Sequence, residues 1–255
     1  MISDREAARV AQPILATEEE TLNGAERELA DVVKEYEITR RDTPETAKAK
    51  IDRAAKVAAV ALMSYLLLRR RNASRAGVDA AQRNLSGIGL PGAMVSGITT
   101  RARMVSAVRP EGMLRRAVAS VTERFRRVAL TRVEPGKMVV TPSRPFVRPT
   151  GLTKPDMAGA LARAREATKG GVTRIVAVET WDGANAEMRR TQAVASVVAP
   201  EAVREWVAKL DMRTCPVCRA LDGKRIPADQ DFELEPPVHP YCRCMVMLTY
   251  GAGIR

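Results

Sequence analysis

Apolar residues recur at heptad spacing near the start of the chain. The residues in this register are Leu15, Leu22, Leu29 and Tyr36, with Ala25 and Val32 between them. This spacing puts one apolar stripe on an acidic helix over about residues 15–40. The stripe is too short to assign a coiled coil. We expect it to pack against the same chain, and docking on a partner protein is the alternative.

A second, longer apolar pattern predicts a helix over about residues 44–84. Thr43 and Pro44 are typical of a helix N-cap and the first helical position. Residues 87–92 then spell a Gly-x-Gly-x-x-Gly motif. No predicted strand precedes the motif, and Pro91 stands where a phosphate-binding turn would lead into a helix. We therefore interpret residues 87–92 as a turn between helices and not as a dinucleotide site.

The segment 98–132 is predicted to be helical and is strongly basic. It contains nine arginines and only two acids, Glu111 and Glu123. The guanidinium group can donate two hydrogen bonds to one phosphate, so contact with a phosphate backbone is one interpretation. Pairing with acids elsewhere in the chain is the other. The candidate contact residues are Arg101, Arg103, Arg115, Arg116, Arg124, Arg126 and Arg127.

A proline-rich stretch, residues 133–154, predicts a linker between a helical N-terminal region (1–132) and a C-terminal domain (155–255). In that domain we expect a helix over 155–168 that ends at Gly170-Gly171, and a second helix over 172–197. A short strand is expected at Trp206, and Asp222-Gly223 is expected to turn between two strands. The predicted fold is mainly α with a small α+β C-terminal domain that contains a β-hairpin and a zinc knuckle.

Composition and charge narrow the class of protein. Aromatic residues make up only 4% of the chain, which favours packed helices over a β-sandwich. The net charge is +12 and residues 1–45 are acidic, so the remaining chain is strongly basic and suits a polyanionic partner. The most apolar run, 57–68, is too short to span a bilayer, and the first residues do not resemble a signal peptide. We expect a soluble protein of a reducing cytoplasm with no membrane partner.

All four cysteines and the only histidine lie within the last 41 residues. Cys215 and Cys218 form a C-x-x-C pair, and His239 and Cys242 form an H-x-x-C pair, with Cys244 as a fifth donor. A tetrahedral zinc ion needs four such groups, so this spacing predicts a structural zinc site with four of the five as ligands. The spacing does not choose between Cys242 and Cys244. Reduced buried cysteines around a hydrogen-bonded histidine, or disulfides, are the alternatives.

The amino-acid sequence of the same region resembles the phage Mu F-like head morphogenesis domain of tailed-bacteriophage minor head proteins. The resemblance rests on Arg174–Thr180, Trp206, Asp211–Lys224 and Pro236–Cys244. It covers about residues 155–250. It implies a structural, non-enzymatic protein of the phage head that is assembled in the host cytoplasm. The implied partners are the portal protein, the major capsid or scaffold protein, and packaged DNA bound without sequence specificity.

Two other functions stay open from the sequence. A sequence-independent nucleic-acid-binding protein without a capsid role would explain the basic segment equally well. A thiol-dependent hydrolase would use one cysteine with His239 as a nucleophile pair. Four cysteines in two close pairs favour ligation over this second alternative.

Overall fold

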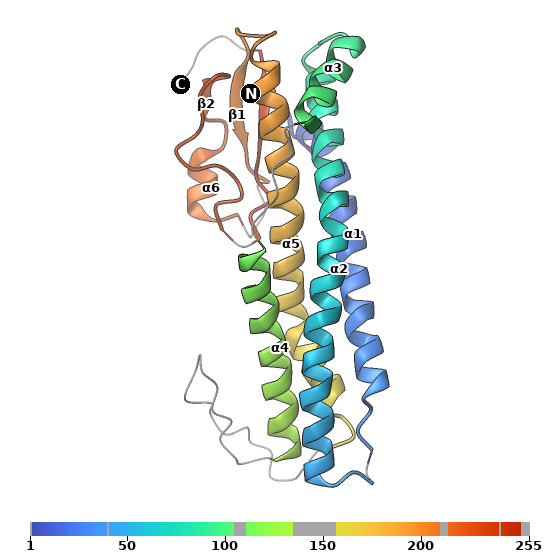
Figure 1. Ribbon diagram of the computed structural model, residues 1–255. Helices are drawn as coiled ribbons and strands as arrows, with labels where there is room; N and C mark the ends of the chain where they lie inside the picture. Colours follow the sequence, from blue (N-terminus) through green and yellow to red (C-terminus); the bar gives the residue numbers. More distant parts are fainter. Residues whose placement is uncertain are drawn as a thin grey trace. The chain divides into compact units, whose positions relative to one another are not determined.

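The structure, a computed structural model, describes residues 2–39, 41–104, 111–134, 157–209, 214–239 and 241–250. This part of the chain is mainly helical with one small sheet, which confirms the predicted fold class (Figure 1). The helices are α1 (Asp4–Glu35), α2 (Pro44–Gly87), α3 (Gly92–Met104), α4 (Gly112–Val133), α5 (Ala160–Ala195) and α6 (Pro216–Leu221). The strands are β1 (Val203–Val207), β2 (Arg225–Pro227) and β3 (Met245–Thr249).

The chain divides into two compact units. The sheet-bearing unit comprises Met1–Thr21, Arg69–Arg109 and Val176–Arg255, and the helical unit comprises Leu22–Leu68 and Pro110–Ile175. Each unit is therefore assembled from stretches that are far apart in the sequence. The predicted linker, residues 133–154, lies almost entirely outside the described residues, so the predicted division at that linker stays a prediction.

Helix α1 begins at Asp4, well before the predicted residue 15. The reason is that its buried stripe extends toward the N-terminus through Val10 and Ile14, on either side of Pro13. In the sheet-bearing unit, Val10 and Ile14 pack in one cluster with Trp181. Leu29 is buried as well, in the helical unit. Of the predicted stripe, Ala25, Leu29 and Val32 are buried against the chain itself. Leu15, Leu22 and Tyr36 are half-buried.

The second predicted helix is confirmed, with small changes at its end. The Thr43 hydroxyl accepts a hydrogen bond from the backbone N–H of Thr46 at 3.3 Å, which is the predicted N-cap. Helix α2 ends at Gly87 and α3 begins at Gly92, so residues 87–92 connect two helices as predicted. Gly89 takes a φ of 84°, a conformation that glycine adopts at little cost.

The helical prediction for residues 98–132 is confirmed for the described residues. Two helices occupy this region, α3 and α4, and residues 105–110 between them lie outside the described part of the chain. Helix α4 begins two residues after Pro110, a residue that has no backbone N–H to donate. The apolar face predicted for this segment is correct, because Val118, Val121 and Phe125 are buried.

The prediction that Gly170-Gly171 ends a helix was wrong. A single helix, α5, runs through both glycines. In the helical unit, a Cβ atom placed on Gly171 would lie 2.7 Å from Cγ2 of Val121, so the absence of a side chain permits close packing against α4. Each glycine inside a helix costs about 1 kcal/mol relative to alanine, and the packing of α5 outweighs that cost.

Strand β1 lies at the centre of the sheet and pairs antiparallel with both β2 and β3, in the order β2-β1-β3. Its residues include Trp206, as predicted. Asp222-Gly223 forms a turn, and Gly223 has a φ of 73°. The turn follows α6 and not a strand, so the connection between the paired strands β1 and β2 is longer than a tight hairpin loop.

Three buried amide side chains hold β3 against the helices of the sheet-bearing unit. Asn84 of α2 accepts from the backbone N–H of Leu248 at 2.8 Å and donates to its carbonyl at 2.9 Å. From α5, Asn185 donates to the carbonyl of Cys244 at 3.1 Å and Gln192 to that of Val246 at 2.6 Å. Because these hydrogen bonds are buried, they fix the position of the strand that follows the last two cysteines.

No helix of the described part of the chain is long and apolar enough to cross a membrane.

Candidate metal centre

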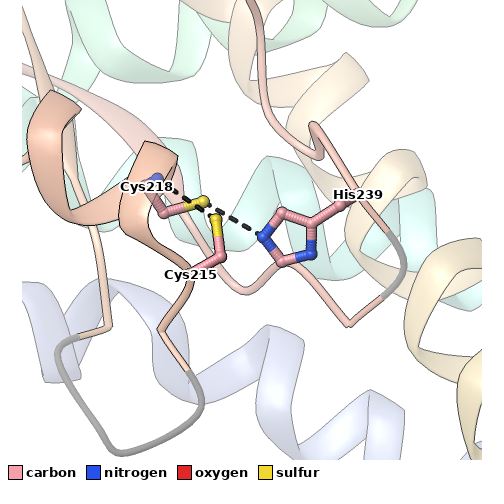
Figure 2. Close-up of side chains that lie close together, drawn as sticks. All are labelled: Cys215, Cys218 and His239. Carbon is pink, nitrogen blue, oxygen red and sulfur yellow. Dashed lines mark hydrogen bonds between the residues drawn. The ribbon is translucent and has the colours of Figure 1, made fainter.

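Cys215 and Cys218 are positioned by the first turn of helix α6. The Cys215 sulfur caps the helix by accepting a hydrogen bond from the backbone N–H of Cys218 at 3.3 Å. Pro216 occupies the first helical position, where its missing N–H costs nothing. A helix turn of this kind places both sulfurs on the same side, toward His239 (Figure 2).

The second arm of the centre carries His239 and Cys242. The backbone N–H of Cys242 donates to the carbonyl of His239 at 3.0 Å, and Tyr241 between them has a φ of 68°. The chain therefore turns tightly between these two residues. Arg243 follows, and its guanidinium group binds Glu18 of α1.

The predicted donors lie in two groups that share one cysteine. The sulfur of Cys218 lies 3.2 Å from Nε2 of His239 and 3.8 Å from the sulfur of Cys242. Two triads form, each with its donor atoms within 4.8 Å of one another: Cys215, Cys218 and His239, and Cys218, Cys242 and Cys244. Cys218 belongs to both. Two thiolates of a tetrahedral zinc site are about 3.8 Å apart, given zinc–sulfur bonds of about 2.3 Å. These groups could hold a metal ion.

The centre is enclosed by apolar side chains. Cys218, Cys242 and Cys244 are buried, and they share one cluster with Trp206, Phe232 and Val246. The Trp206 ring meets the Phe232 ring edge-on, with the centroids 5.6 Å apart. An apolar shell of this kind limits access of water to bound metal and strengthens the electrostatic interactions inside it.

The thiols differ in how easily they lose a proton. Burial raises the pKa of Cys218 to about 12. The hydrogen bond that Cys242 accepts from the Cys244 thiol lowers the pKa of Cys242 to about 5, and backbone N–H groups of Cys244 and Val238 add to this effect. The same hydrogen bond raises the pKa of Cys244. In the metal-free protein, the negative charge therefore belongs on Cys242, with Cys244 as its hydrogen-bond donor.

The geometry bears on the alternatives left open by the sequence. The four cysteines are free thiols, which does not support the disulfide alternative. The Cys218 sulfur lies 3.2 Å from Nε2 of His239, and Cys218 is only 1% exposed. A nucleophilic cysteine needs access to its substrate and a lowered thiol pKa, and Cys218 has neither. Cys215 of the same triad is half-buried, and although burial opposes it, the hydrogen bond from the backbone N–H of Cys218 lowers the pKa of Cys215.

The candidate arginines are distributed over two helices in different surroundings. Arg101 of α3 and Arg116 and Arg124 of α4 are exposed, and Arg127 is half-buried. None of these four forms an ion pair with another described residue. By contrast, Arg115 pairs with Glu111 at 2.8 Å, and Arg126 pairs with Asp52 at 2.7 Å. The side chain of Arg103 lies outside the described part of the structure.

Sequence reasoning missed the polar residues that support the centre. Glu18 of α1 accepts a hydrogen bond from Nε1 of Trp181 at 2.6 Å and also binds Arg243. Arg204 of β1 is almost fully buried among acidic and carbonyl oxygens. A signal for Glu18 was present, because it falls within the apolar register of α1. No local pattern marks Arg204.

The region that holds this centre also carries the match to a known family. Residues 150–247 match the family model described as Phage Mu protein F like protein. The match confirms the resemblance carried by the cysteine–histidine motifs over residues 150–247. The family suggests a phage head morphogenesis protein with a structural role in the virion. Comparisons with curated proteins and with solved structures found no match.

Proposed function

We propose that the protein is a minor head protein of a tailed bacteriophage that takes part in procapsid assembly at or near the portal. The observation that carries this proposal is the family match over residues 150–247, which contain every ligand candidate of the centre. The partners that fit are the portal protein and the major capsid or scaffold protein. A predominantly helical chain with a small cross-linked module suits a scaffolding role, and no catalytic step is assigned to it.

The metal that the donor set fits best is zinc. Thiolate and imidazole ligands are typical of structural zinc sites, in which four protein groups leave no position for a substrate. Cys215, Cys218 and His239 would supply three ligands, and Cys242 or Cys244 the fourth. Such an ion would contribute folding energy to the module, in addition to the apolar cluster around the cysteines.

Packaged DNA is the polyanion that the basic helices would meet inside a head. Arg116, Arg124 and Arg127 of α4 support this part of the proposal, since no ion pair with a described acid neutralises them. Guanidinium groups bind phosphates without reading bases, and binding releases counterions. We therefore expect contact that depends strongly on salt and weakly on sequence.

The direct test combines a pull-down with portal protein and mass spectrometry of mature virions. The full-length chain is expected to bind portal and to be present in purified heads. Absence from both virions and procapsids would count against the head-protein function. A chain that binds duplex DNA in a salt-dependent way, yet neither portal nor heads, would identify the second candidate, a nucleic-acid-binding protein without a capsid role.

A further inference from the structure

His239 stands at the end of a segment that has no regular secondary structure of its own. Residues 228–238 connect β2 to His239 and contain neither helix nor strand. Only a few of their side chains are buried, among them Ala228 and Phe232. A segment of this kind can position a metal ligand only if other groups fix its path, because backbone freedom costs about 1–2 kcal/mol per ordered residue.

Arg204 is the residue that ties this segment to the sheet. Its side chain lies on β1 and is 3% exposed. One terminal nitrogen, Nη1, donates to the carbonyl of Gln230 and to Oδ1 of Asp231, both at 2.6 Å. The other, Nη2, donates to Oε1 of Glu235 at 2.9 Å. The guanidinium carbon also lies 5.8 Å from the centre of the Phe232 ring.

The Glu235 carboxylate that binds Arg204 also forms a hydrogen bond within the segment itself. Oε1 of Glu235 accepts a second hydrogen bond, from the backbone N–H of Phe232 at 3.0 Å. At the next residue, Pro236, the backbone carbonyl accepts a hydrogen bond from Arg189 of α5 at 2.9 Å. The residues that lead into His239 are thus attached at three consecutive places, and two of these attachments depend on Arg204.

The network around Arg204 is not an efficient source of stability. Nε of Arg204 and Oε2 of Glu235 are buried and have no hydrogen-bond partner. Leaving buried polar atoms unpaired costs free energy, and a buried ion pair is often no more stabilising than apolar residues of the same volume. A network of this kind is better explained by the conformation that it specifies.

Strand β1 connects Arg204 to both arms of the metal centre. Side chains alternate along a strand, so Arg204 and Trp206 lie on the same face. Trp206 packs in the cluster that contains Cys218 and Cys242, and β1 is followed in the sequence by the Cys215 turn. We propose that Arg204 is a positioning residue, which orders residues 228–238 so that His239 reaches the cysteines before the metal binds. This assignment rests on the metal site proposed above.

Arg204 does not touch the donor atoms, so its loss is expected to act on affinity and not on the ligand set. Removal of residues that orient metal ligands costs 10- to 100-fold in metal affinity in typical cases. Arg204→Met alone would leave Glu235 without its cation. The double variant Arg204→Met/Glu235→Gln removes that uncompensated charge and separates positioning from simple destabilisation.

The sheet offers a matched control in Arg225. Arg225 lies on the same sheet with a side chain that is 13% exposed, and it pairs with Glu205 at 2.8 Å. It does not contact residues 228–238 in any described hydrogen bond or ion pair. Arg225→Met therefore removes a comparable ion pair at a position that does not hold the His239 segment.

The experiment measures zinc affinity of the full-length protein by competition with a chromophoric chelator, with the cobalt(II) absorption spectrum and thermal melting of the metal-free form as further readouts. We expect the double variant to bind zinc 10- to 100-fold more weakly and to keep the cobalt spectrum of the wild type, whereas Arg225→Met stays within about threefold of the wild-type affinity. The milder variant Arg204→Lys, which keeps the charge and loses the planar fork, is expected to fall between them.

Three results would overturn the assignment. The first is a wild-type affinity in the folded double variant, and the second is an equal loss in Arg225→Met. If the double variant does not fold, Arg204→Lys decides in the same way, and an unchanged affinity overturns the assignment. A wild-type protein that binds no zinc would instead remove the metal site itself, while the head-protein function would stand or fall by the portal and virion experiments.

Discussion

Glu18 and Arg243 are 225 positions apart in the sequence and form a buried ion pair in the sheet-bearing unit. Nε of Arg243 donates to Oε2 of Glu18 at 3.1 Å, and Nη2 donates to Oε1. The Glu18 side chain is 7% exposed and that of Arg243 19%. Because Arg243 stands between Cys242 and Cys244, this pair fixes the last two cysteines relative to helix α1. The same carboxylate also accepts from Trp181, so it satisfies two separate donors.

Replacement of Glu18 by alanine is expected to destabilise the protein by about 3 kcal/mol, because it removes the carboxylate that accepts hydrogen bonds from both the Arg243 guanidinium and the Trp181 indole. Urea unfolding of the full-length chain measures this change. Glu19→Ala is the control, since Glu19 is the exposed neighbour on the same helix and its loss should change stability by no more than about 0.5 kcal/mol. Equal effects of the two substitutions would contradict a stabilising role for the Glu18–Arg243 pair.

Metal removal provides the second prediction. A ligand present at 100 times its Kd stabilises a folded protein by about 2.7 kcal/mol, which corresponds to roughly 5–10 °C in Tm for a chain of this size. We expect a strong chelator to lower the Tm by this amount and zinc to restore it. Metal content is measured in parallel by elemental analysis. Melting that ignores the chelator, in a protein without stoichiometric zinc, would remove the metal hypothesis.

The individual cysteines should differ in importance. Cys218 belongs to both donor triads, so Cys218→Ser is expected to abolish metal binding and to lower the Tm as much as the chelator does. Cys242→Ser and Cys244→Ser then identify the fourth ligand, because only the substitution of a true ligand removes a thiolate from the cobalt spectrum. Since Cys244 donates a hydrogen bond to Cys242, we expect the Cys242 substitution to have the larger effect. The reverse order would assign the fourth position to Cys244.

Alanine substitutions at the adjacent glycines of α5, Gly170 and Gly171, are expected to change the stability of the protein in opposite directions. At Gly170, a Cβ atom meets nothing within 4 Å, so Gly170→Ala should stabilise the helix by up to about 1 kcal/mol. At Gly171, the same atom would lie 2.7 Å from Val121, and overpacking costs about 1–3 kcal/mol. Thermal unfolding of the two single variants measures the difference. Stabilisation by both substitutions would show that the contact between α4 and α5 is looser than the structure has it.

The cysteine–histidine motifs could be predicted from their local spacing in the sequence. The contacts that support them could not, because they join residues that are far apart in the sequence. A C-x-x-C turn and an H-x-x-C turn each bring two donors together within four residues, so their chemistry can be read directly. Gly171 was misread as a helix end because its role depends on Val121, which no local pattern reveals. Arg204 is bound by residues 26 to 31 positions later. Such contacts arise from tertiary packing, which propensity and periodicity do not encode.

The arginines of α4 allow the effect of net charge on DNA binding to be distinguished from the effect of arginines that have no described ion pair. If Arg116 and Arg124 bind phosphates, replacing both by glutamine should reduce the slope of log affinity against log salt by about 1.8, because each lost phosphate contact changes the slope by about 0.9. The control with the same change in net charge is Arg115→Gln/Arg126→Gln. Those two arginines already pair with Glu111 and Asp52, so their loss should alter the slope by less than half as much. Fluorescence anisotropy with a random-sequence duplex measures both. Equal changes in the two double variants would mean that net charge alone governs binding, and that no arginine face of α4 is specialised for DNA.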